Sequence, residues 1–204
     1  MSLKTKNLPS VTAFVVLNYI AFAFVNHLPW QFFKEVDYYS ESTLLFKNPL
    51  IAIGVHLGIL ILCFIIPTRL KYLIIFWRLK NPLPGTRVFT ELVAEDPRID
   101  IKELENRYGK LPTDPKAQNA LWYKIYKENE DEKIINSSHG HWLLFREIAV
   151  ISAIIVLLLV PISLSINVGK GSIIYVFSMM AQYLILRQAA VNAAERFTCN
   201  VLAR

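Results

Sequence analysis

Residues 148–162 read IAVISAIIVLLLVPI, a run without any Lys, Arg, Asp or Glu. Three further stretches share this absence of charge: residues 11–28, 50–66 and 172–186. A soluble protein of this size rarely contains four such runs, because its helices need a polar outer face toward water. The pattern therefore indicates a membrane protein in which the apolar runs are transmembrane helices.

The composition agrees with this interpretation and defines the fold class. Hydrophobic residues make up 54% of the 204 positions and charged residues make up 19%, against a globular average of about 25% charged residues. Each charge-free run is slightly shorter than the roughly 20 residues that cross a hydrocarbon core, so apolar flanking residues must complete each span. We predict an all-α polytopic membrane protein with four transmembrane helices and a small helical cytoplasmic domain between helices 2 and 3.

The predicted organisation alternates spans with loops of very different length. In chain order it comprises transmembrane helix 1 (8–28), a periplasmic loop (29–48), transmembrane helix 2 (49–67), the cytoplasmic domain (68–141), transmembrane helix 3 (142–166), a short periplasmic loop (167–171), transmembrane helix 4 (172–190) and a cytoplasmic tail (191–204). An even number of spans places both termini on the same side of the membrane. The domain is small, so we expect it to lean on the membrane helices or on other subunits.

The distribution of positive charge predicts the orientation of the chain. Fourteen Lys or Arg residues lie between residues 68 and 147, whereas the segment 163–172 contains only Lys170. Loops that are rich in Lys and Arg are retained in the cytoplasm. We therefore expect a bacterial inner-membrane protein whose termini and long loop are cytoplasmic. Because this retention also explains the net charge of +6, we expect no direct nucleic-acid binding.

The second span ends at Pro67, but apolar residues continue through Trp77, interleaved with Arg69, Lys71 and Arg78. Three arrangements remain open. The helix could continue past a kink at Pro67, it could turn and lie along the headgroups, or it could pack on the cytoplasmic domain.

Two soluble helices are predicted inside the cytoplasmic domain. Asp100 is a suitable N-cap for a helix that ends at Gly109, and Asp114 followed by Pro115 starts the next helix. The second helix carries aromatic residues at Trp122, Tyr123 and Tyr126. These three are candidate partner-binding residues, since aromatic side chains dominate interface anchors. Burial inside the protein's own small domain is the alternative, and the sequence does not decide between the two.

Small residues inside the spans predict close helix packing between copies of the chain. Gly54 and Gly58 lie four residues apart on either side of His56, a spacing that lets two backbones approach closely. The inner end of the fourth helix repeats the pattern with four alanines, which are Ala189, Ala190, Ala193 and Ala194. We predict these seven residues as an oligomer interface. A proton or ion path lined by His56 is the alternative, but such a path normally needs several ionisable groups in series.

The sequence contains no recognisable catalytic motif. It contains no phosphate-binding glycine loop, no nucleophile elbow and no zinc-protease helix motif. His139 and His141 are two residues apart, and a helix points such side chains to different faces, whereas a helical metal pair needs a spacing of three or four. We predict no enzymatic activity, no metal site and no cofactor.

Two functional classes follow from these expectations. The first is a non-enzymatic membrane scaffold or sensor that self-associates in the bilayer and presents its cytoplasmic domain to a soluble protein partner. The second is an oligomeric channel or membrane-disrupting effector that is triggered from the cytoplasmic side. Few charges or hydroxyl groups line the spans, which favours the scaffold.

Three stretches have the look of family motifs: Leu83-Pro84-Gly85-Thr86-Arg87, Asp96-Pro97-Arg98-Ile99-Asp100 and Gln118-Asn119-Ala120-Leu121-Trp122-Tyr123. In its size and hydropathy the whole chain resembles the membrane subunits of small bacterial anti-phage defence systems, the Kiwa system above all. This resemblance implies a homo-oligomeric membrane sensor whose cytoplasmic side holds a DNA-binding partner.

Overall fold

The computed structural model describes residues 3–27, 49–166 and 170–203, and these residues form helices and connecting turns without any strand. The helices in chain order are α1 (Leu3–His27), α3 (Pro49–Ile65), α4 (Thr68–Phe76), the short η1 (Pro84–Arg87) and η2 (Val88–Leu92), α5 (Val93–Glu95), α6 (Ile101–Tyr108), α7 (Pro115–Glu128), α8 (Lys133–Ile166) and α9 (Lys170–Leu202). The predicted loop at 29–48 and the beginning of the one at 167–171 lie outside the described residues.

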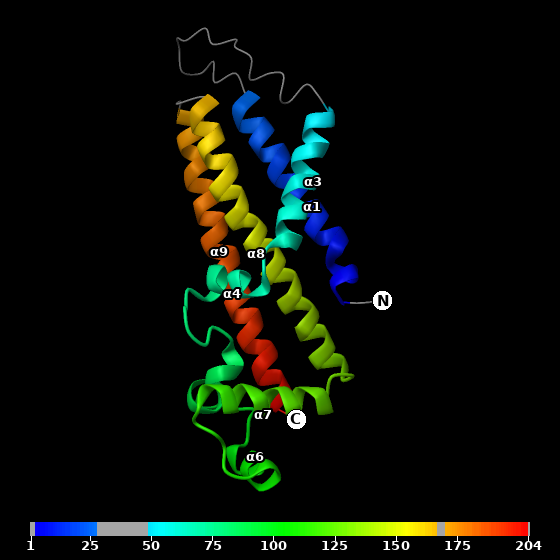
Figure 1. Ribbon diagram of the computed structural model, residues 1–204, viewed down its shortest axis with the longest axis vertical. Helices are drawn as coiled ribbons and strands as arrows, with labels where there is room; N and C mark the ends of the chain where they lie inside the picture. The colour runs from blue at the N-terminus through cyan, green and yellow to red at the C-terminus, as the bar shows by residue number, and fades with distance from the viewer. Residues whose placement is uncertain (1–2, 28–48, 167–169, 204) are drawn as a thin grey trace.

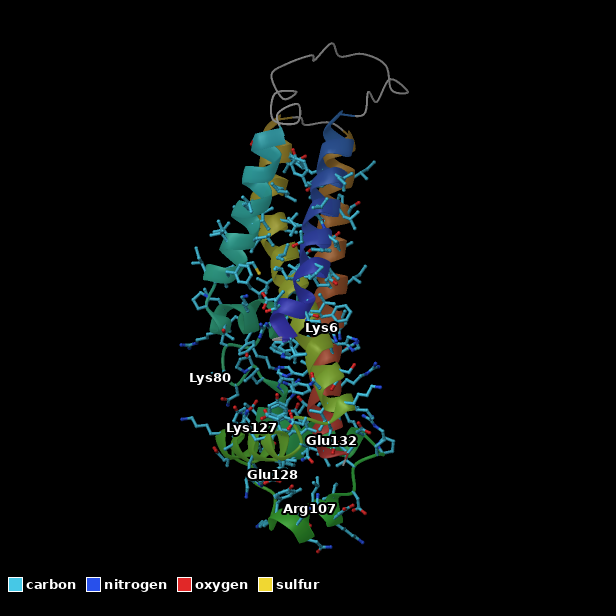
Figure 2. All side chains as sticks on the ribbon, turned by 90° about the vertical axis from the view of Figure 1, so that its right-hand side faces the viewer. Lys6, Lys80, Arg107, Lys127, Glu128 and Glu132 are labelled. Atoms are coloured by element: carbon cyan, nitrogen blue, oxygen red, sulfur yellow. The ribbon has the colours of Figure 1, made fainter. Side chains whose placement is uncertain are left out.

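The helices divide into two halves along the long axis of Figure 1. In the upper half, α1 and α3 lie beside the adjoining halves of α8 and α9. In the lower half α8 and α9 continue; α4 lies beside them near the middle of the molecule, α7 runs across their lower end, and α6 lies below α7. Figure 2 labels six charged side chains, and all of them lie in the middle or in the lower half of the molecule. Both long helices therefore connect an apolar bundle to a charged one.

The described residues contain two helices that are long and apolar enough to cross a membrane, Lys133–Ser165 and Ile173–Leu202. A third candidate arises if the bent pair Leu57–Ile65 and Thr68–Phe76 is counted as one span. The expectation of an all-helical fold is thus confirmed, with two to three candidate spans.

Large apolar side chains cover the outside of the upper half. The most exposed among them are Leu17 at 64%, Phe64 at 71%, Ile65 at 70%, Leu157 at 71%, Phe177 at 68% and Ile185 at 68%. Soluble monomers rarely expose so many large apolar residues together, because water penalises the contact. This outer surface is suited to a lipid environment.

The chain turns sharply at Pro67, where the axes of α3 and α4 differ by 98°. Proline has no N–H to donate and its ring crowds the preceding helical turn, which favours a break. The helices α1 and α8 continue through Pro9 and Pro161, but at Pro67 the direction of the chain changes by 98°. The helix therefore does not continue past a mere kink, and α4 instead packs on α8. The Trp142 ring centroid lies 6.4 Å from that of Tyr72 and 5.8 Å from that of Phe76.

The helices predicted to begin after Asp100 and Asp114 are confirmed together with their N-caps. The Asp100 carboxylate accepts hydrogen bonds from the backbone N–H groups of Lys102 and Glu103, and α6 stops at Gly109, which has φ of 80°. The Asp114 carboxylate accepts from the N–H groups of Lys116 and Ala117 at the start of α7. These acids satisfy donors that have no partner in the first helical turn.

Candidate functional site

An uncovered stripe runs along α3 in the upper half. Gly54, Leu57, Gly58 and Ile61 follow the spacing of one helix face, and Leu57 and Ile61 are 50% and 54% exposed. Outside the backbone of α3 itself, a Cβ atom built on either glycine would meet no heavy atom of the described residues within 4 Å. The structure therefore leaves this glycine face, as defined by these four residues, open to a neighbour. The side chain of His56 lies outside the described parts of the chain.

The alanines of α9 are divided between the core and the surface. Ala190 is 0% exposed and Ala194 is 3% exposed, so both lie in the core of a single chain. Ala189 and Ala193 are partly exposed. Ala190 and Ala194 therefore pack closely within a single chain, whereas Ala189 and Ala193 remain partly accessible.

Polar side chains of three different helices meet in the middle of the upper half. The Gln182 amide nitrogen donates to Asn18 Oδ1 at 2.8 Å and to Ser152 Oγ at 3.2 Å. Asn18 is 5% exposed and Ser152 is fully buried. Hydrogen bonds of this kind join transmembrane helices, because lipid offers polar groups no alternative partner. The contact holds α1, α8 and α9 together.

The three motif-like stretches of the sequence converge on the C-terminal part of α9. From the first stretch, the Arg87 guanidinium lies 2.7 Å from the Glu195 carboxylate. From the second, Arg98 Nη1 donates to Asn200 Oδ1 at 2.9 Å. The third stretch supplies Trp122, whose indole also contacts α9. We call residues 83–128 together with the α9 segment 194–202 the cytoplasmic unit, in the sense of the predicted topology.

Trp122 docks α7 onto α9. Its indole nitrogen donates to the Thr198 carbonyl oxygen at 3.0 Å, and its ring meets the edge of Phe197 at a centroid distance of 5.6 Å. Gly85 favours this close junction, since a Cβ there would lie 2.7 Å from Asn119 Oδ1 and 3.3 Å from the Trp122 ring. A larger residue at position 85 would force the Asn119 and Trp122 side chains to shift.

Tyr126 and His139 complete the aromatic cluster. The His139 ring stacks on Phe197 at 4.7 Å, and the Tyr126 hydroxyl lies 3.2 Å from His139 Nδ1. Trp122 and Tyr126 thus contribute to the interior of the chain, whereas Tyr123 stays 51% exposed. Of the three predicted partner-binding residues, Tyr123 is the most accessible.

Sequence reasoning missed Phe197, the ring on α9 that contacts Trp122, Tyr126 and His139. Ala190, Ala194, Phe197 and Val201 are all buried and share one helix face. Their spacing of four, three and four residues is the signal of a core-facing stripe. That spacing is visible in the sequence and could have identified the inner side of α9.

An ion pair between Arg98 and Asp96 fixes the loop at residues 96–100. Arg98 donates from Nε to Asp96 Oδ1 at 2.9 Å and from Nη2 to Asp96 Oδ2 at 2.6 Å. These hydrogen bonds hold the pKa of the Asp96 carboxyl below its ordinary value. The paired arginine is in this way oriented toward Asn200 on α9.

A buried ionic cluster lies at the bend between the two halves. Lys71 Nζ lies 2.5 Å from Glu147 Oε2, and Arg146 Nη2 lies 2.5 Å from Glu147 Oε1. Cys63 Sγ lies 3.1 Å from the same Glu147 Oε2. The sequence around Arg146 and Glu147 gives no indication that Lys71 is their partner.

The described residues bring together no group of three or more His, Cys, Asp or Glu side chains suited to a metal ion. Comparisons with protein families, with curated proteins and with solved structures gave no significant match. The function of this chain is therefore inferred from its own contacts.

Proposed function

We propose that this protein is a four-span scaffold or sensor of the bacterial inner membrane that self-associates and presents its cytoplasmic unit to a soluble protein partner. The observation that carries the proposal is the open glycine face of α3. A lipid-facing helix needs no small residues, whereas two helices that pack closely do. Gly54 and Gly58, with Leu57 and Ile61 beside them, offer such a contact surface.

The four spans of the proposal are α1, α3, the later part of α8 and the earlier part of α9. Their apolar stretches lie side by side in the upper half of Figure 1, and Lys and Arg concentrate in the segments that lead to the lower half. This segregation supports an orientation in which the lower half is cytoplasmic.

The partner surface of the proposal is the outer side of α7. Trp122 and Tyr126 are engaged with α9, but Tyr123 is exposed on the same helix. An aromatic side chain held on a rigid helix is a good interface anchor, because little further entropy is lost when it is covered. We assign Tyr123 as the primary contact of the partner.

Self-association is tested by the mass of the purified protein in detergent, measured by light scattering. Gly54→Leu together with Gly58→Leu should reduce the mass to that of the monomer, since the two side chains would hold neighbouring backbones apart. Ala181→Leu is the matched control, because it enlarges an exposed small residue on α9 and should leave the mass unchanged. A mass of the double variant equal to that of the natural protein would contradict the assigned interface.

We further propose, from the resemblance in size and hydropathy, that the scaffold acts in anti-phage defence and that its partner binds DNA. Cells that carry the protein with its genetic neighbours should resist phage, and Tyr123→Ala should abolish both resistance and co-purification of the partner. The channel is the competing function. A potential-sensitive dye that reports depolarisation when the protein is expressed alone and challenged with phage would favour it over the scaffold.

A further inference from the structure

A pocket of about 120 Å³ lies where α1, α3, α4 and α8 meet at the bend. One wall is ionic and consists of Lys71, Arg146 and Glu147. Most of the other lining residues are apolar and include Leu8 and Phe64, which are 41% and 71% exposed. The pocket thus joins a charged interior to the apolar outer surface of the bundle.

The ionic wall carries more positive than negative charge. Lys71 and Arg146 are 7% and 6% exposed, so both cations are more than nine-tenths buried. Glu147 is the sole acidic residue among the described residues that line the pocket, and both cations share it. A buried cation needs a full counter-charge, because desolvation is costly. One further anion would balance the pocket.

The pocket lies at the level where an anionic headgroup would be found, a step that rests on the proposed four-span topology. The chain turns by 98° at this point, so α4 runs across the bundle axis instead of along it. At the far end of α4, the Arg187 guanidinium lies 3.8 Å from the centroid of the Trp77 ring. Trp and Arg are the residues that anchor helices at the membrane–water interface.

We propose that this pocket binds an anionic phospholipid of the inner leaflet. Its phosphate would lie against Lys71 and Arg146, and its acyl chains would pass over Leu8 and Phe64 into the bilayer. The volume corresponds to roughly four water molecules, so it receives a phosphate group but leaves the chains outside. Basic pockets between transmembrane helices on the cytoplasmic side recognise anionic headgroups in this way. The bound lipid would connect α1 and α3 to α4 and α8.

The test measures the melting temperature of the protein in uncharged detergent while lipid is added. Phosphatidylglycerol should raise the melting temperature in a concentration-dependent manner, because a ligand that binds only the folded state stabilises it. Phosphatidylcholine of the same chain length and inorganic phosphate should not. An equal response to inorganic phosphate, or to both lipids, would overturn the proposal.

Substitutions separate the pocket from general charge attraction. Arg146→Gln should weaken the apparent affinity for phosphatidylglycerol about tenfold, the loss of one charge-assisted contact. Glu147→Gln should retain or strengthen binding, since it removes the competing carboxylate. Arg69→Gln is the matched control: it removes an exposed cation at the start of α4, outside the pocket, and should change nothing. An unaltered lipid response in Arg146→Gln would contradict the site.

A further variant tests the pocket without removing a charge, so the test remains valid if the charge variants misfold. Leu8→Trp keeps every charge and enlarges an exposed residue of the pocket lining. It should melt like the natural protein without lipid and should lose the response to phosphatidylglycerol; a retained response would overturn the proposal. The mass in detergent, measured on the same samples, reports the α3 interface separately. An unchanged oligomer without any lipid response would refute the lipid site while leaving the proposed function intact.

Discussion

The indole nitrogen of Trp122 donates a hydrogen bond to the backbone carbonyl oxygen of Thr198 at 3.0 Å. The two residues lie 76 positions apart in sequence, on α7 and α9. Because α9 also extends into the apolar upper half (Figure 1), the contact connects the cytoplasmic unit to the part of the chain proposed to cross the membrane.

Removing Trp122 should therefore release α7 from α9. Trp122→Ala should destabilise the protein by about 3 kcal/mol, because the cavity adds to the lost burial. Trp122→Phe keeps most of the ring contact and should lose about 1 kcal/mol, the value of one hydrogen bond. Limited proteolysis of residues 83–128 measures the release. Tyr123→Ala is the control. If protease cut residues 83–128 as fast in Tyr123→Ala as in Trp122→Ala, docking would not depend on the indole.

The buried alanine stripe of α9 should not tolerate larger side chains. Ala190 is fully buried, so Ala190→Leu should destabilise the fold by roughly 2 kcal/mol through overpacking. Ala189→Leu, at the partly exposed neighbouring position, should melt close to the natural protein. Equal melting temperatures for the two variants in detergent would be inconsistent with the observed packing of α9.

The N-cap of α7 should contribute measurably to the stability of the cytoplasmic unit. Asp114→Ala removes the acceptor of two backbone N–H groups and should cost about 1 kcal/mol. Asp114→Asn retains a side-chain oxygen and should be nearly neutral. Hydrogen exchange of the amides of residues 116–118 gives the readout; unchanged protection in Asp114→Ala would exclude a capping role.

The contribution of Asp96 to the stability of the fold should decrease as the pH falls. Hydrogen bonds from Arg98 lower the pKa of Asp96 in the folded state relative to the ordinary value of 3.8. The resulting stability is present above that value and is lost as the pH falls through the lower, folded-state pKa. The natural protein should therefore melt above Asp96→Asn at neutral pH, and the difference should shrink in strong acid. A difference that grows on acidification would refute this assignment.

Much of the fold could be predicted because it depends on local signals. The caps at Asp100 and Asp114 and the stop at Gly109 are properties of a few neighbouring residues. The charge-free runs likewise predict transmembrane helices from the local sequence alone, without any knowledge of tertiary contacts. These features follow from the chemistry of backbone groups and of the bilayer.

The site could be predicted less completely because its contacts are long-range. Nothing near Lys71 in sequence points to Glu147, and nothing near Trp122 points to Thr198. The bend at Pro67 left three arrangements open in the sequence, and no residue near Pro67 indicated that α4 packs against Trp142 of α8. Ala190 and Ala194 had the spacing of an interface, and such spacing is the same whether a helix packs within a chain or between chains.

The proposed topology, with the upper half in the membrane and the lower half in the cytoplasm, underlies every functional proposal for this protein. Single cysteines at positions 41 and 127, placed in a background with Cys63 and Cys199 replaced by Ala, test it with a membrane-impermeant maleimide in intact cells. We expect Glu41→Cys to be labelled in intact cells and Lys127→Cys to be labelled only after the inner membrane is permeabilised. Labelling of Lys127→Cys in intact cells, or protection of Glu41→Cys until permeabilisation, would contradict this topology.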